Sequence, residues 1–290
     1  MSSRLSDFKS IFYDSKRHEF FGRDGNGWAK LAIVYSVYYF GLAAFFCAMI
    51  TILMSITPQD VPRYSSTTSC MQSRSNPLSP GMGFRPQPNV LENLVYIDKN
   101  ATKLGTDRYV KNLNQYLELY YANHTGNYRT DSEKFVIDPK DCTPKNHYGF
   151  SDGKPCILVK MNKIVGFKPI PGYQKHEQDA YKQSGCQSDP NAITVHCYGE
   201  YASDIDNIGD ITYISENGHF EKCGSLDTKW FPYKGKKARQ DVYQAPYVWV
   251  QFNNLNPNVL IHVVCRLYAE NINFDRKSAG LTRFKLFLKG

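Results

Sequence analysis

The stretch that decides the architecture of this chain lies near its N-terminus, where residues 31–57 read LAIVYSVYYFGLAAFFCAMITILMSIT without one charged side chain. About 20 apolar residues are enough to cross the hydrocarbon core of a bilayer, so this run can cross it with some tilt. A cleaved secretory signal has a shorter apolar core, of about 7–15 residues, and a small-residue cleavage site. The sequence therefore predicts one uncleaved transmembrane helix over residues 31–57.

Positive charges are distributed unequally on the two sides of this run. Six Lys and Arg side chains precede it, whereas only Arg63 and Arg74 occur in the 20 residues that follow it. Segments rich in Lys and Arg stay in the cytoplasm, so residues 1–30 are predicted to be cytoplasmic and residues 58–290 extracellular. The expected location is the plasma membrane, with a single span and the C-terminus outside the cell.

Cysteines and glycosylation acceptors favour the same orientation. Cys47 lies within the apolar run, and seven more cysteines follow it, namely Cys70, Cys142, Cys156, Cys186, Cys197, Cys223 and Cys265. Extracellular domains use cysteines as disulfide cross-links, whereas the cytosol keeps them reduced. The sequons that begin at Asn100 and Asn123 predict N-glycosylation of both residues, which also requires the extracellular side.

The part beyond the apolar run divides into a stalk, residues 58–90, and a folded domain, residues 91–290. The first is rich in Pro, Ser and Thr, a composition that favours an extended chain over a packed core. In the second, Val110, Leu113 and Leu117 recur at helical spacing and predict a helix over about residues 107–122. Short runs rich in β-branched and aromatic residues follow at 157–159, 193–195, 211–214, 248–252, 260–268 and 283–289. The fold class is therefore a single-pass transmembrane helix plus a mainly-β extracellular domain, with an antiparallel β-sandwich.

Two sequence patterns are typical of catalysis, and both lack the context that catalysis needs. Residues 149–153 (GFSDG) match the nucleophile elbow of hydrolases, which requires a strand before the serine and a helix after it, but Pro155 follows almost at once. Asp204 and Asp206 resemble the D-x-D pair that holds a divalent cation in sugar-nucleotide transferases, yet the pair continues as an acidic turn. We expect no enzyme, no cofactor, and no catalytic or metal-binding residue.

The net charge of +8 is spread along the chain without a polybasic run. Together with the predicted membrane topology, this distribution argues against a nucleic-acid partner, and it indicates a solvated basic surface.

Seven short segments, in order along about residues 20–288, resemble the beta subunits of the sodium/potassium pump and of its relative, the proton/potassium pump. They are residues 20–23 (FFGR), 35–43 (YSVYYFGLA), 83–86 (GFRP), 153–156 (GKPC) with 165–169 (VGFKP), 230–236 (WFPYKGK), 250–252 (VQF) and 268–272 (YAENI). The resemblance implies an immunoglobulin-like sandwich with a helix at its side. It also implies a non-catalytic subunit that assembles with the catalytic alpha subunit of a P-type ATPase, supports its folding and delivery to the plasma membrane, and modulates potassium affinity. Membrane lipid and a small single-span regulatory subunit are further expected partners.

Candidate partner-binding residues occur in the membrane segment and in one extracellular motif. Tyr35 and Tyr39 are four residues apart and so share one helix face, and a hydroxyl in hydrocarbon needs a hydrogen-bond partner such as a neighbouring helix supplies. The resemblance places an aromatic motif against an extracellular loop of the catalytic subunit, namely Trp230, Phe231, Pro232 and Tyr233. Such a cluster suits an interface, but it is equally typical of a protein core.

The resemblance also implies two disulfides, Cys142–Cys156 and Cys197–Cys265. The family's first disulfide has no counterpart here, because the stretch over residues 131–141 looks shortened. We hypothesise that Cys186–Cys223 is a substitute cross-link and that Cys70, on the stalk, is free or joined to another chain. The sequence alone does not fix this connectivity.

Two other functions stay open on the sequence. One is a cell-adhesion glycoprotein of the same membrane topology that acts without a pump. The other is a type II sugar-nucleotide transferase built on Asp204 and Asp206, which we rank last.

Overall fold

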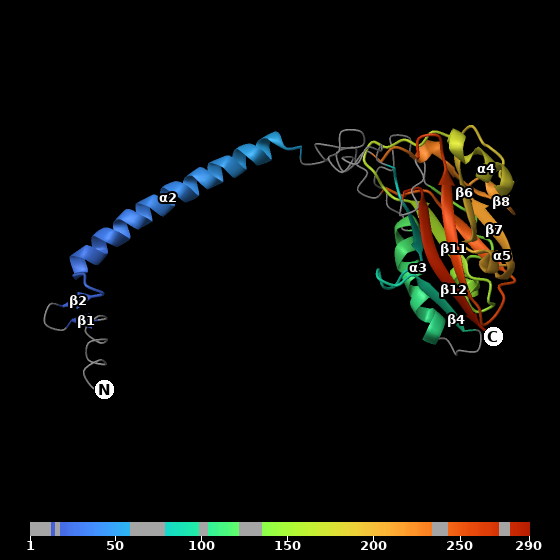
Figure 1. Cartoon of the computed structure of the whole chain (residues 1–290), viewed down its shortest axis with the longest axis horizontal. Coiled ribbons are helices and arrows are strands. Elements are labelled where there is room, and N and C mark those ends of the chain that lie inside the picture. Colours follow the sequence, from blue (N-terminus) through green and yellow to red (C-terminus); the bar gives the residue numbers. More distant parts are fainter. Residues whose placement is uncertain are drawn as a thin grey trace. The chain divides into compact units, whose positions relative to one another are not determined.

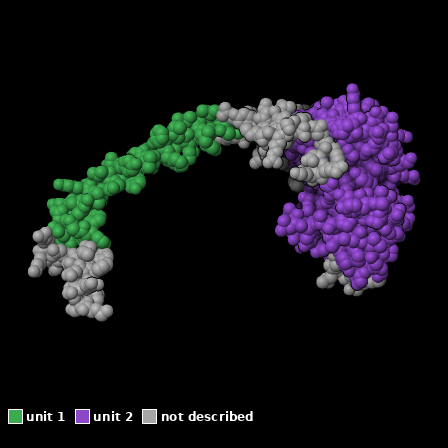
Figure 2. Space-filling view, in the orientation of Figure 1, with its two compact units in different colours: residues 1–59 green, residues 60–290 purple. Residues whose placement is uncertain are grey.

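The computed structural model describes residues 13–14, 18–58, 79–98, 104–121, 135–233, 243–272 and 279–290. The chain divides into two units, residues 1–59 and residues 60–290, which Figure 2 shows in green and purple. The predicted glycosylation sites Asn100 and Asn123, and the stalk cysteine Cys70, lie outside the described residues.

The N-terminal unit is a short ribbon, β1 (Tyr13–Asp14) and β2 (Glu19–Phe20), followed by the long helix α2 (Gly25–Ile56). The helix begins ahead of the predicted residue 31 because Asp24 caps it, its carboxylate accepting a hydrogen bond from the Gly27 N–H at 2.8 Å. Trp28 joins the ribbon to the first turn, since its indole N–H donates to the Phe20 carbonyl at 2.7 Å. None of the α2 side chains is buried within this unit, and the helix is long and apolar enough to cross a membrane.

The C-terminal unit is a sandwich of two five-stranded sheets (Figure 1). The first sheet has the order β3 (Met82–Arg85), β5 (Cys156–Met161), β10 (Tyr247–Asn253), β7 (Asp210–Ser215) and β8 (Gly218–Phe220). The second has the order β4 (Leu94–Asp98), β12 (Leu281–Lys289), β11 (Leu260–Tyr268), β6 (Ala192–Gly199) and β9 (Gly224–Asp227). One hydrophobic core lies between them and contains side chains of both sheets, as where the Phe252 and Phe284 rings meet.

The strands that were predicted from the sequence form the centre of both sheets. Each of the six predicted runs lies within an observed strand, and residues 260–268 coincide with β11. Residues alternate in β12, where Phe284, Leu286 and Leu288 are all buried in the core. Runs of β-branched and aromatic residues therefore identified the strands that pack on the core.

Helix α3 (Leu104–Tyr121) confirms the predicted helix and lies along the sandwich next to β4 (Figure 1). Its buried side chains include Leu113 and Leu117, as the spacing predicted. Two hydroxyls fix the helix in place: Tyr109 accepts a hydrogen bond from the Tyr96 N–H of β4 at 3.0 Å, and Tyr120 donates to the Ala245 carbonyl at 2.8 Å. The Tyr109 bond satisfies a backbone donor of an edge strand that would otherwise be open to another chain.

Two features of the sandwich differ from the prediction. Residues 82–85 were assigned to the stalk but form β3, with Met82 and Phe84 buried and the Phe84 ring 4.9 Å from that of Phe284. The folded domain therefore begins before residue 91. The second sheet is also not wholly antiparallel, because β4 pairs with β12 in parallel. The sequence analysis did not predict β3 and β4, because prolines lie around β3 and both edge strands are short.

Short helices complete the domain. They are η3 (Pro144–Gly149), η4 (Lys175–Glu177), α4 (Gln178–Ser184), α5 (Ala202–Asn207) and η5 (Thr228–Trp230). Two contacts hold η4 and α4 against the second sheet: Arg266 of β11 donates to the buried carboxylate of Glu177, and the Tyr181 ring packs edge-on against Tyr268, with centroids 5.0 Å apart. These contacts position the chain that leads into Cys186.

Candidate functional site

The helix α2 presents a tyrosine face. The rings of Tyr35 and Tyr39 stack, with centroids 6.1 Å apart, and Tyr38 meets Tyr39 edge-on at 5.4 Å. All three side chains are more than half exposed, and the described residues supply no hydrogen-bond partner for the hydroxyls of Tyr35 and Tyr39. In hydrocarbon an unsatisfied hydroxyl costs free energy, so this face is the part of the helix best suited to contact a neighbouring helix.

The predicted aromatic motif is divided between the core and the surface. Trp230 and Phe231 are buried, and the Trp230 indole N–H donates to the Glu216 carboxylate at 2.6 Å. The Trp230 ring also packs edge-on against Phe135, with centroids 5.5 Å apart. These two aromatic residues are therefore mainly structural in the isolated domain, whereas Pro232 and Tyr233 remain partly exposed.

Tyr233 belongs to a cationic surface that the sequence did not reveal. Its ring lies 5.0 Å from that of Tyr243, and the Lys163 ammonium lies 5.6 Å and 5.2 Å from the two centroids. Lys163 also donates to the Tyr243 carbonyl at 3.1 Å. Partial burial lowers the pKa of Lys163, and the nearby Lys160 lowers it further. Cations over aromatic faces are held in place by the ring quadrupole, so this geometry fixes a positive charge at the surface.

The same surface continues across the helix α3 through Tyr116. The Lys160 ammonium lies 4.8 Å from the Tyr116 ring centroid. The guanidinium of Arg85, a residue of β3, lies 5.5 Å from the same centroid. We call the whole set the tyrosine–lysine surface; it comprises Arg85, Tyr116, Lys160, Lys163, Tyr233 and Tyr243. No described carboxylate forms an ion pair with any of its three cations. The surface is therefore an uncompensated positive patch with apolar ring faces between its charges.

Among the described residues of the C-terminal unit, three disulfides join the cysteines that the sequence analysis paired. Cys142–Cys156 and Cys197–Cys265 are fully enclosed in the core. Cys186–Cys223 joins the turn after α4 to the turn before β9, and its cysteines are only partly buried. Cys47 on α2 is a free thiol and is exposed within its unit.

The two catalytic patterns do not form catalytic sites. Ser151 lies in a turn after η3 rather than between a strand and a helix, although its hydroxyl is 3.0 Å from His147 Nδ1. Asp204 is buried, and its carboxylate accepts a hydrogen bond from the Tyr201 N–H at 3.1 Å, so that it caps α5. Asp206 lies on the same short helix, and the described residues contain no group of three His, Cys, Asp or Glu side chains that could hold a metal ion.

A helix of membrane length, a disulfide-linked β-sandwich and exposed aromatic surfaces are the features of a membrane-anchored accessory protein. Residues 1–285 match the family described as the sodium/potassium ATPase beta chain. The chain belongs to this family, whose members are accessory subunits that partner with the catalytic alpha subunit of the pump.

Individual relatives agree with this assignment. The chain is 27% identical to the probable sodium/potassium-transporting ATPase subunit beta-3 of Caenorhabditis briggsae, over 97% of this chain and 86% of that protein. It is 28% identical to the sodium/potassium-transporting ATPase subunits beta-2 of Mus musculus and Homo sapiens, over 97% of this chain and 94% of each relative. The likeness therefore covers both the helical unit and the sandwich.

Proposed function

We propose that this chain assembles with the catalytic alpha subunit of a sodium/potassium-exchanging ATPase, supports its folding and delivery, and modulates its potassium affinity. The observation that carries the proposal is the family match, which extends over residues 1–285 and so includes both units. The anchor has its N-terminus in the cytoplasm and its sandwich outside the cell, at the plasma membrane. The excess of Lys and Arg before the helix and three disulfides after it support that orientation.

Two surfaces serve assembly in this proposal. The face of α2 that carries Tyr35 and Tyr39 contacts a transmembrane helix of the catalytic subunit, while its other faces contact membrane lipid and a small single-span regulatory subunit. The tyrosine–lysine surface contacts an extracellular loop of the catalytic subunit, and its uncompensated cations favour a loop that carries carboxylates. Pro232 and Tyr233 contribute directly to this contact, whereas Trp230 and Phe231 support it from the core.

The decisive test of the proposed function is co-purification. The full chain, tagged at its N-terminus and expressed in animal cells, is expected to bring a P-type ATPase catalytic subunit with it when it is purified in mild detergent. Mass spectrometry identifies that subunit and also decides between sodium and proton pumps. An unrelated single-span protein of the same orientation is the control. If the chain reaches the cell surface without any such subunit, the pump assignment fails and the adhesion alternative takes its place.

Replacing Lys163 by alanine is expected to weaken assembly without unfolding the domain. The change removes one fixed cation and its contact with two tyrosine rings. Truncation of an interface residue that contributes strongly to binding costs more than about 1 kcal/mol, so we expect at least roughly a fivefold loss of affinity. The fraction of catalytic subunit that co-purifies after a detergent wash measures the loss. Lys145→Ala, which removes an exposed lysine from η3, is the matched control. Equal retention by both variants would show that the tyrosine–lysine surface is not part of the contact.

A further inference from the structure

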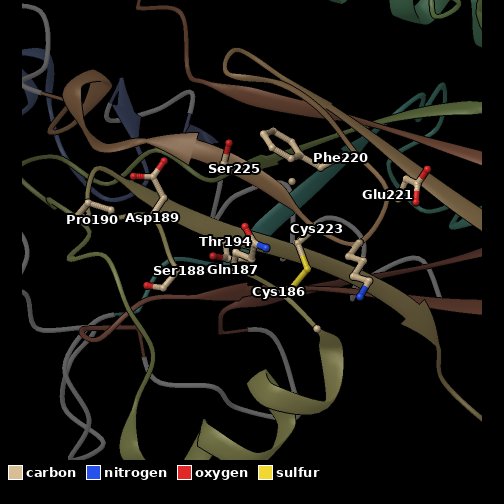
Figure 3. Close-up of a pocket in the computed structure, with 13 residues that line it drawn as sticks. Cys186, Gln187, Ser188, Asp189, Pro190, Thr194, Phe220, Glu221, Cys223 and Ser225 are labelled. Carbon is tan, nitrogen blue, oxygen red and sulfur yellow. A yellow bond between two sulfur atoms is a disulfide. The ribbon is translucent and has the colours of Figure 1, made fainter.

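The Cys186–Cys223 disulfide differs from the other two because it lines an open groove (Figure 3). The groove has a volume of about 620 Å³, which is within the range of small-molecule binding sites. All four cysteines of the other two disulfides are at most 2% exposed, so a soluble thiol reaches them only if the sandwich opens. Cys186 and Cys223 are both partly exposed in the closed domain.

The groove lies beside β8 and β9, which are edge strands of the first and the second sheet. One wall is the segment over residues 185–190, between α4 and β6, and the other is the segment over residues 220–225, which runs from the end of β8 into β9. Thr194 and Ser225, which are partners in the β6–β9 ladder, also line it. The Ser225 hydroxyl is shielded from solvent and has no hydrogen-bond partner in the described chain. The lining therefore combines polar groups with the apolar side chains of Pro190 and Phe220, and it suits a small ligand that presents both kinds of surface.

Two side chains beside the disulfide are placed to stabilise the thiolate that forms when the bond opens. The Ser184 hydroxyl oxygen lies 2.8 Å from Cys186 Sγ. That hydroxyl donates to the Tyr181 carbonyl at 2.6 Å in the disulfide form and can rotate toward a negative sulfur. Lys222 precedes Cys223 in the chain, and its side chain reaches Gly185, where an added Cβ would be 3.3 Å from Nζ, so its charge lies close to the chain at both cysteines. A nearby cation lowers the pKa of either thiol, and the Ser184 hydroxyl, which contacts Cys186 alone, makes Cys186 the better leaving group.

We propose that Cys186–Cys223 is an exchangeable disulfide that reacts in this groove with a small peptide thiol of the glutathione class. The thiol loses its proton to water, and its sulfur attacks Cys223 Sγ. The Cys223–Cys186 bond breaks, its electron pair passes to Cys186 Sγ as a thiolate, and a mixed disulfide forms on Cys223. A second thiol attacks the mixed disulfide at the peptide sulfur, releases the oxidised peptide dimer and leaves Cys223 as a thiol.

The domain stays folded when this bond opens. The helix α4 keeps the Arg266–Glu177 ion pair and the packing of Tyr181 on Tyr268. Strand β9 keeps its ladder with β6, from Ala192–Asp227 to Val195–Gly224. Exchange therefore frees only the two turns that form the groove, and it changes the groove without releasing the core disulfides.

The test uses the full chain in detergent micelles, incubated with reduced and oxidised glutathione at fixed potentials. Free thiols are trapped by acid and alkylation, and every cysteine peptide is quantified by mass spectrometry. We expect the Cys186 thiol and a glutathione adduct on Cys223 to appear at least tenfold faster than any thiol from the other two pairs. Reduction of all three disulfides at one common rate, or reduction of Cys197–Cys265 before Cys186–Cys223, would overturn the proposal.

The variant Lys222→Gln tests whether the neighbouring cation speeds the exchange or whether exposure of the disulfide alone accounts for the rate. The variant is expected to slow the exchange by about three- to tenfold, because the leaving thiolate loses its neighbouring cation. Lys175→Gln, at the far end of η4–α4, removes the same charge from the molecule and is expected to leave the rate unchanged. Equal rates for Lys222→Gln and the wild type, or adducts on Cys186 rather than Cys223, would contradict the proposed role of Cys186 as leaving group.

Discussion

A chain in which Cys265 is replaced by serine is expected to lose most of its delivery to the cell surface as part of an assembled pump. Cys265 and Cys197 face each other in the β11–β6 register with their Cα atoms 4.0 Å apart, and both are buried. Their bond joins residues 68 positions apart in the sequence, and a cross-link over such a loop contributes about 4 kcal/mol in the chain-entropy account. A domain whose whole stability is about 5–15 kcal/mol loses a large part of it.

The surroundings of this disulfide add to the expected loss. The Tyr213 hydroxyl, from β7 of the opposite sheet, accepts a hydrogen bond from the Cys197 N–H at 2.8 Å and donates to the Cys197 carbonyl at 3.2 Å. Burial raises the pKa of the Tyr213 phenol, so the hydroxyl stays neutral and keeps both roles. A strand that shifts at Cys197 therefore also loses a link between the two sheets.

Surface biotinylation, followed by capture of the catalytic subunit, measures the effect of Cys265→Ser. A several-fold drop in surface complex is expected, because a loss of a few kcal/mol shifts the chain toward degradation. The double variant Cys186→Ser with Cys223→Ser is the matched control. Its cysteines lie 37 positions apart in the sequence, which gives a chain-entropy loss of similar size, but its serines are partly exposed, whereas Cys265→Ser leaves a hydroxyl and an unpaired thiol in the core, so the control should lose less. Equal loss in both variants, or normal delivery of Cys265→Ser, would contradict this ranking of the disulfides.

The sequence predicted the centre of the sandwich better than its edges, for a physical reason. A central strand such as β11 is paired on both sides and is buried along most of its length, so its pattern of β-branched and apolar residues is strong. Edge strands need less of that pattern: β4 is completed by β12 and by the Tyr109 hydroxyl of α3, contacts that only the folded chain brings together. The short helices α4 and α5 span too few residues for helical periodicity to be recognised.

The candidate surfaces could be predicted only in part. Tyr35 and Tyr39 could be placed on one face because both lie in one helix, where spacing determines direction. The sequence of residues 230–233 did not show which of these residues are buried and which are exposed. The burial of Trp230 depends on Phe135 and Glu216, which are distant in the sequence. The tyrosine–lysine surface was missed for the same reason, since its residues come from β3, α3, β5 and from segments outside the described helices and strands.

Replacing residues 31–57 by a leucine-rich span of equal length is expected to keep the membrane topology and to weaken assembly. The topology survives because the Lys and Arg residues that set it lie outside the replaced segment. Assembly weakens because the Tyr35 and Tyr39 hydroxyls are lost, and hydrogen bonds between membrane helices contribute about 0.6 kcal/mol on average and up to about 1.7 kcal/mol each. Two such bonds correspond to roughly a seven- to threehundredfold change in the association constant.

The narrower variant Tyr35→Phe with Tyr39→Phe tests whether the hydroxyls carry this effect, because it keeps both stacked rings and removes only the polar atoms. Tyr38→Phe is the control, since its ring meets Tyr39 edge-on and lies off the stacked pair. The measurements are the fraction of catalytic subunit retained in detergent and the potassium concentration that half-activates ATP hydrolysis by the complex. A leucine-rich span that leaves both quantities unchanged would show that α2 only anchors the domain, and assembly would then rest on the tyrosine–lysine surface alone. A loss with the leucine-rich span but not with the double phenylalanine variant would assign the contact to packing of the helix face rather than to its hydroxyls.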